Sequence, residues 1–222
     1  MNIHLILLPI VSTSLLFLGI LTYFRDKQSA TSKAFFFLTL SMGIWVFIGG
    51  YMTNGASFML PNLTLWMKIT FTFGYLMGAS LVYLALAFPK RERSVVLRWY
   101  EKLWLFSAFV FIPLIPTTNL FLKESWFVGD HIATKDGPLI IIPTIWGVLS
   151  VLATFVILFL KYRRAQGLTR TQFKYVFLGI FLFGFLGATF NLVIPAFGLN
   201  QFLNFGLYAP IFLVSCISYA II

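Results

Sequence analysis

Long apolar stretches separated by short polar segments fill almost the whole chain. There are seven of them, and each reaches or approaches the roughly 20 residues that a helix needs to cross a bilayer. Lipid offers no partner to backbone amides, which leaves helices or closed barrels. Unbroken runs such as Phe177–Leu186 lack the two-residue alternation of a barrel strand, so we expect helices. The predicted spans are Ile3–Phe24, Ala34–Met52, Asn62–Phe88, Leu103–Leu122, Leu139–Leu160, Tyr175–Pro195 and Phe202–Ile222.

Basic residues fall on alternate loops of this pattern. Thirteen of the 16 Lys and Arg residues follow the first, third and fifth predicted spans. Short basic loops stay in the cytoplasm, which predicts an outside N-terminus and a cytoplasmic C-terminus. Anionic lipid headgroups are a sufficient counter-charge for the net charge of +10, so no nucleic-acid partner is predicted. The predicted fold is all-α: one polytopic seven-transmembrane helix bundle over residues 1–222, in the cytoplasmic (inner) membrane.

Composition supports this class and limits the chemistry. The chain is 60% apolar and only 10% charged, which excludes a soluble domain. Cys216 is the single cysteine, so no intrachain disulfide can form. The one long outer loop, Lys123–Pro138, ends in turn-forming residues. Within it, Trp126–Val128 and His131–Ala133 could pair as a short hairpin.

Catalysis is not predicted. No Asp or Glu lies inside a predicted span, and the two histidines lie at the N-terminus and in an outer loop. The sequence therefore has no paired carboxylates, no metal-binding HExxH and no nucleophile beside a base. The seventh span has no lysine that could hold retinal. We predict no cofactor, no metal and no enzymatic activity for this region.

Polar groups in a membrane are costly, so each one calls for an explanation. Lys68 lies near the outer end of the third span and shares one helical face with Thr72 and Tyr75. Its side chain could snorkel into water, or it could hold an anionic or carbonyl group of a ligand.

Other polar and aromatic residues lie toward the same outer half. Asn191 could bind a ligand or lock two helices by a hydrogen bond. Asn204 and Tyr208 begin the seventh span. Trp146 could belong to an interfacial aromatic belt, whereas Trp45 is too deep for the belt and fits a core or pocket wall. Together these residues predict an apolar, aromatic cavity open to the outer leaflet, suited to a small amphipathic or lipid-like ligand.

The C-terminal part of the chain carries a resemblance. Its features are Thr169–Gln172 at the start of the sixth helix, Asn191, Pro195–Gly198, Gly206 with Ala209 and Pro210, and Tyr219–Ile222 at the end. This arrangement resembles the seven-helix N-terminal sensor region of bacterial and archaeal histidine kinases. The layout is also similar to that of the sensor part of membrane kinases that detect acyl-homoserine lactones. The resemblance implies an input module that binds a ligand and signals through the seventh helix to a dimeric cytoplasmic kinase or other output domain of the same longer chain.

The chain departs from that family at Ile222, where the linker, the phospho-accepting histidine and the ATP-binding domain would follow. We therefore expect a membrane fragment of a longer protein. The main alternative is a small transporter built from three, one and three helices, which predicts similarity between its two halves. Little is found. A purely structural membrane subunit is the third class, and it predicts a bundle packed tightly to its outer end.

Overall fold

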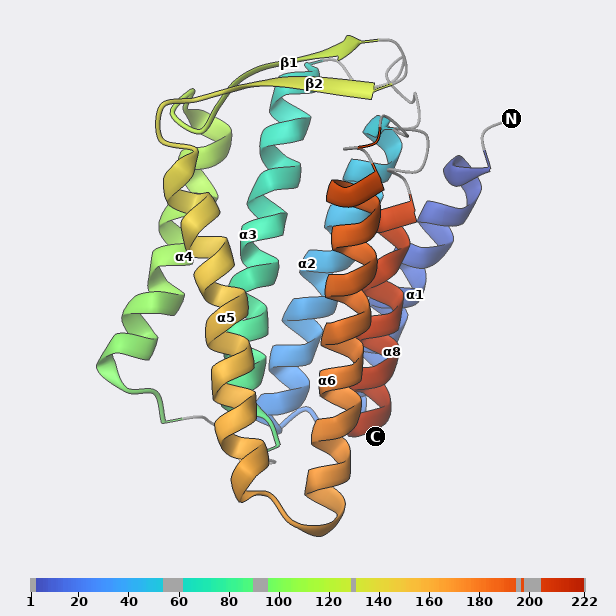
Figure 1. The fold of residues 1–222 in the computed structure, drawn as a ribbon, viewed down its shortest axis with the longest axis vertical. Coiled ribbons are helices and arrows are strands. Elements are labelled where there is room, and N and C mark those ends of the chain that lie inside the picture. Colours follow the sequence, from blue (N-terminus) through green and yellow to red (C-terminus); the bar gives the residue numbers. More distant parts are fainter. Residues whose placement is uncertain are drawn as a thin grey trace.

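The protein, seen in a computed structural model, is an upright helical bundle covered at one end by a β-hairpin (Figure 1). The structure describes residues 3–53, 62–89, 96–128, 131–194, 197 and 205–221. Its elements are α1 (His4–Arg25), α2 (Ala30–Thr53), α3 (Leu63–Ala87), α4 (Trp99–Thr117), β1 (Leu122–Val128), β2 (His131–Asp136), α5 (Ile141–Arg164), α6 (Gly167–Ala188), the π-helical turn η2 (Thr189–Val193) and α8 (Ala209–Ile221).

The two ends of the bundle differ in character. We call the end beneath β1 and β2 the hairpin end. The opposite end, which carries Arg25, Lys161, Arg163 and Arg164, is the basic end. The C-terminus lies at the basic end, and the N-terminus lies toward the hairpin end (Figure 1).

Among the described residues, four helices are long and apolar enough to cross a membrane: α1, the segment Ala30–Gly50 of α2, α3 and α5. A shorter apolar helix, Phe205–Ile221, contains α8. The prediction of a helical membrane protein is therefore confirmed. The count of seven spans and the orientation of the N-terminus stay predictions.

Helix α5 shows how the lipid environment inverts the usual pattern of a soluble protein. Its buried stripe carries Ser150 and Thr154, which are 0% and 2% exposed. Its exposed stripe is apolar and includes Val148, Leu152 and Val156, each more than half exposed. A contiguous apolar surface of this kind marks contact with lipid or another apolar partner.

Small residues bring α1 and α2 together. A Cβ atom on Gly19 would lie 1.9 Å from Thr39 Oγ1, so only glycine allows this approach. The Ser12 hydroxyl donates to the Gly43 carbonyl at 2.7 Å. These helices pack with α3, α6 and α8 around one core, whose fully buried members include Leu15, Phe35, Leu38, Met42, Phe88, Phe173 and Leu213.

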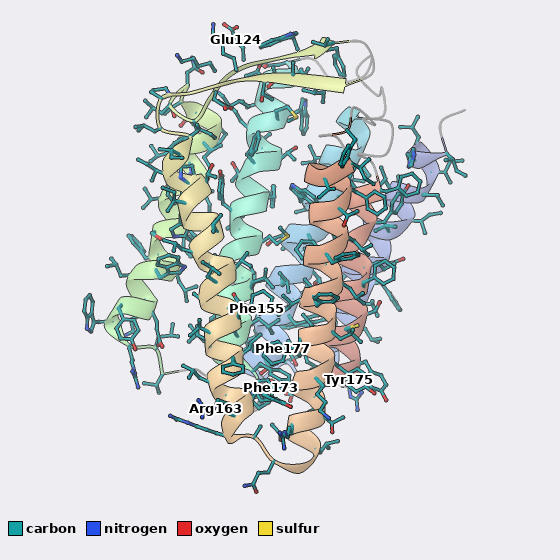
Figure 2. All side chains as sticks on the ribbon, viewed as in Figure 1. Glu124, Phe155, Arg163, Phe173, Tyr175 and Phe177 are labelled. Atoms are coloured by element: carbon teal, nitrogen blue, oxygen red, sulfur yellow. The ribbon has the colours of Figure 1, made fainter. Side chains whose placement is uncertain are left out.

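A second, smaller core joins α3, α4 and α5. Its buried members are Ala79, Ala108 and Trp146, and Tyr75, Trp104, Leu105 and Phe111 pack around them. Helix α3 therefore belongs to both cores. Between α5 and α6, the aromatic contacts lie toward the basic end, where Phe155 stacks on Phe177 at 6.5 Å (Figure 2).

The hairpin pairs the two predicted segments and extends beyond them. Trp126 lies opposite Ala133, and Val128 lies opposite His131. Backbone hydrogen bonds from Gly137 to Phe121 and from Leu139 to Leu120 continue the connection toward α5. The described residues of the loop that was predicted to lie outside thus form an antiparallel ribbon across the end of the bundle (Figure 1).

Candidate functional site

Lys68 is buried on α3 below the hairpin. Its side chain is only 6% exposed, and its Nζ donates to Asn119 Oδ1 at 2.8 Å. Asn119 lies between α4 and β1, far from Lys68 in the sequence. Among the described residues no carboxylate pairs with this ammonium group. A buried cation is costly unless it is neutralised, so one neutral amide leaves Lys68 with unused capacity for an anionic partner.

The hairpin lies directly on the same face of α3. Thr64 is one turn before Lys68, and its hydroxyl oxygen accepts a hydrogen bond from the Ser125 backbone N–H at 3.1 Å. The Ser125 hydroxyl itself is buried and has no partner, the one such side-chain atom in the part of the chain that the structure describes. Buried polar atoms are nearly always paired, so this hydroxyl also has unused hydrogen-bonding capacity.

Thr72 and Tyr75 continue this face of α3 toward the middle of the bundle. The Thr72 hydroxyl donates to the Lys68 carbonyl at 2.8 Å, a common bond within one helix. The Tyr75 ring lies 6.0 Å from Phe111 and 6.5 Å from Trp146, centroid to centroid. Tyr75 therefore forms part of the aromatic wall between α3, α4 and α5.

Two tryptophans join α4 to α5 in a reciprocal arrangement. The indoles of Trp104 and Trp146 stack with centroids 5.6 Å apart and planes 15° apart. Trp146 Nε1 donates to Ser107 on α4 at 2.9 Å, and Trp104 Nε1 donates to Ser150 on α5 at 3.2 Å. Each buried indole N–H is thus satisfied by the opposite helix, which fixes the spacing of the two helices.

Trp45 and Tyr208 lie on other helices. A Cβ atom on Gly74 would lie 3.7 Å from Trp45 Nε1, so Trp45 packs across the α2–α3 contact. The Tyr208 hydroxyl is 2.7 Å from His4 Nδ1, and the two rings pack with Phe205. Tyr208 therefore connects the start of α1 to the start of α8.

The two predicted asparagines are less fully described. Asn191 belongs to η2, a π-helical turn of a kind that is frequent at functional sites. Its side chain lies outside the described part of the structure, as does the whole of Asn204.

The structure thus gathers Lys68, Thr72, Tyr75 and Trp146 on one side of the bundle beneath the hairpin, with Trp45 on the neighbouring helix. Sequence analysis did not find Asn119, Ser125 or the two serines that receive the indole N–H groups. No local pattern marks them, because each acquires its role from a contact with a distant segment. The predicted outer cavity stays a prediction, and Asn204 and the side chain of Asn191 lie outside the described residues.

The basic end contains a contact that sequence analysis also missed. Lys161 on α5 donates to the carbonyl oxygens of Ala85, Leu86 and Phe88 at 2.8, 2.6 and 2.7 Å. These carbonyls terminate α3, where the helix dipole is negative and the backbone lacks partners. The Thr31 hydroxyl donates to the Ala87 carbonyl at 3.0 Å. The end of α3 is therefore held by α5 and α2 together.

Helix α4 begins earlier than its apolar stretch, and its start is capped. The Glu101 carboxylate accepts a hydrogen bond from the Arg98 backbone N–H at 2.7 Å, which gives this N–H at the helix start a partner. The hydrogen bond to the Tyr100 hydroxyl raises the pKa of the exposed Arg98 guanidinium, so this charge persists at all physiological pH values. Glu101 thus lies inside a helix, although the apolar pattern predicts no acidic residue there.

These features define a multi-pass helical membrane protein with a hairpin cover and a cluster of aromatic side chains between α3, α4 and α5. Comparison with protein families identifies the class more closely. Residues 7–222 match the family described as the N-terminal 7TM region of histidine kinase. The chain belongs to this family, as its resemblance predicts. This region of a histidine kinase is not itself catalytic, and the family name links it to a kinase output domain. No curated protein and no solved structure matches the chain.

Proposed function

We propose that this chain is the signal-input domain of a sensor histidine kinase, and that it binds a small amphipathic or lipid-like ligand at the hairpin end. The observation that carries the proposal is the burial of the Lys68 ammonium group with only the Asn119 amide as its partner. A ligand carboxylate, phosphate or lactone carbonyl would accept hydrogen bonds from the remaining Lys68 N–H groups and compensate for the buried charge.

The surroundings of Lys68 suit the two parts of such a ligand. The polar part would lie near Lys68 and the unpaired Ser125 hydroxyl, beneath β1. The apolar part would lie along the aromatic wall of Tyr75 and Trp146. The hairpin would have to shift for the ligand to enter, because Ser125 contacts Thr64 directly.

Signalling requires two bundle arrangements with different ligand affinity. We propose that α8 transmits the change, because its start is joined to α1 through Tyr208 and His4 and its end lies at the basic end. In this proposal the N-terminus is outside the cell, the basic end is in the cytoplasm of a prokaryotic cell, and α8 leads to a homodimeric output domain of the same longer chain. Family membership favours this function over the three-one-three transporter.

The test is a binding screen of the purified chain. Native mass spectrometry and thermal-shift measurements would compare acyl-homoserine lactones, fatty acids and lipids. For a ligand that binds, Lys68→Ala should weaken affinity by roughly tenfold or more, the value of one charge-assisted hydrogen bond. Lys123→Ala, on the exposed face of β1, is the matched control for the loss of a lysine and should bind normally.

Asn191→Ala tests the role of the π-helical turn in the same assay, and it should weaken the response without unfolding the bundle. Unchanged ligand affinity in both Lys68→Ala and Asn191→Ala would remove these residues from the site. Transport of the ligand by proteoliposomes that contain the chain would instead support the transporter.

A further inference from the structure

A cavity of about 410 Å³ opens at the basic end, at the opposite end of the bundle from Lys68. Its volume is within the range of small-molecule sites, roughly 300–1,000 Å³. It lies where α1 and α8 end, where α2 and α6 begin, and beside the residues that follow α3 (Figure 1). The polar side chains that line it belong to Thr22, Arg25, Asp26, Ser29, Thr31, Ser32, Thr169 and Gln172.

The start of α6 lies beside this cavity. Gln166, the residue before the helix, makes no side-chain hydrogen bond to the first turn. Leu168 and Thr169 of that turn line the cavity. The N–H groups of a first turn have no partner within the helix, and the helix dipole makes this end positive. An uncapped first turn that faces a cavity favours an anion there.

Side chains in the cavity have unused donors as well. Ser32 is 2% exposed and lines the cavity, and its hydroxyl makes no hydrogen bond to any described residue. Arg25 is an exposed residue, and its guanidinium makes no hydrogen bond or ion pair to the residues that the structure describes. A ligand with acceptor oxygens would satisfy both groups.

The one carboxylate in the cavity is already engaged. Asp26 Oδ1 accepts hydrogen bonds from the backbone N–H groups of Gln28 at 3.3 Å and Ser29 at 3.1 Å. These bonds stabilise the turn between α1 and α2. The turn thus engages one Asp26 oxygen, and Thr169 and Gln172 offer donors as well as acceptors to a ligand.

We propose that this cavity binds a phosphate group, as a phospholipid headgroup or as a free phosphate, between Arg25, Ser32 and the first turn of α6. Phosphate oxygens accept several charge-assisted hydrogen bonds at once, which suits this set of donors. Ala220 and Ile221, the last described residues of α8, line the same cavity. Occupancy would therefore bear on the position of the helix that leaves the bundle. This site does not depend on a ligand at the hairpin end.

The experiment uses the whole 222-residue chain in nanodiscs of phosphatidylcholine, with and without phosphatidylglycerol. Native mass spectrometry measures which lipids stay bound when the protein is released from the nanodisc. A thermal-shift assay in pure phosphatidylcholine measures the effect of inorganic phosphate on the unfolding temperature. The variants are Arg25→Gln and Ser32→Ala. The control is Lys27→Gln, which removes one charge from the same turn. Lys27 does not line the cavity, and its ammonium lies 4.5 Å from the Phe24 ring centroid.

The native chain should retain phosphatidylglycerol in preference to phosphatidylcholine if the source is a lipid, or respond to inorganic phosphate if the source is soluble. In either case Arg25→Gln should weaken binding about tenfold and Ser32→Ala about threefold, with Lys27→Gln unchanged. Ser32→Ala removes only one hydroxyl group. It therefore still tests the proposal if the Arg25→Gln variant does not fold. Equal retention of both lipids with no response to phosphate would overturn the proposal, as would equal losses in Lys27→Gln and Arg25→Gln.

Discussion

Replacing Lys161 by methionine should detach α5 from the end of α3. The ammonium group of Lys161 donates to three carbonyl oxygens, of Ala85, Leu86 and Phe88, at 2.6 to 2.8 Å. Methionine has a similar length and apolar surface but no donor and no charge. The variant therefore leaves the last carbonyls of α3 without this partner while it preserves most of the packing.

The magnitude follows from the number of bonds and their charge. A hydrogen bond to a charged group contributes about 1.5–3 kcal/mol, and a cation near a helix C-terminus adds about 0.3–1 kcal/mol. Three bonds from one ammonium group are not additive, and water can replace part of them at this partly buried position. We therefore expect a loss of about 2–4 kcal/mol in the free energy of unfolding.

The assay is equilibrium unfolding of the purified chain in mixed micelles, followed by circular dichroism and tryptophan fluorescence. Arg164→Met is the control, because Arg164 lies in the same last turn of α5 and is exposed. It should cost less than about 0.5 kcal/mol. If Lys161→Met unfolds at the same denaturant concentration as Arg164→Met, the three hydrogen bonds do not hold the two helices together.

Two further predictions concern helix packing and use the same unfolding assay. Gly19→Ala should destabilise the α1–α2 contact by about 1–3 kcal/mol, because its Cβ would overlap the Thr39 hydroxyl, whereas Gly184→Ala has free space and should be nearly neutral. Equal effects of the two substitutions would contradict the close approach. A double-mutant cycle of Trp146→Phe and Ser107→Ala should give a coupling of about 1 kcal/mol for their hydrogen bond. Additive effects would mean that the bond contributes nothing.

The apolar pattern located every long helix of the structure but not its ends. Helix α6 begins at Gly167, before the predicted start at Tyr175, because the helix continues through a polar, basic turn. Helix α4 ends at Thr117, so Phe121 and Leu122 belong to the connection and to β1. Hydrophobicity reports the length of chain in lipid, whereas helix ends depend on caps and hydrogen bonds.

The predicted ligand site stays a prediction, and its residues have different surroundings in the structure. The periodicity of one helix placed Lys68, Thr72 and Tyr75 on a shared face, and their contacts run toward the hairpin and the aromatic wall. Tyr208 pairs instead with His4 across the bundle, which no local pattern indicates. Lys161 is one of the basic residues that follow the fifth predicted span, and its ammonium group donates to the carbonyl oxygens at the end of α3.

The sequence by itself determined the class of the protein, because the length and apolarity of its stretches leave membrane helices as the physically allowed structure. It also marked the hairpin segments, through their turn residues and aromatic content. Only the tertiary structure decided which polar groups come together: Lys68 with Asn119, Lys161 with the end of α3, and Arg25 with Thr169 and Gln172 around one cavity. Such contacts join segments far apart in the chain, so they depend on how the helices pack against one another.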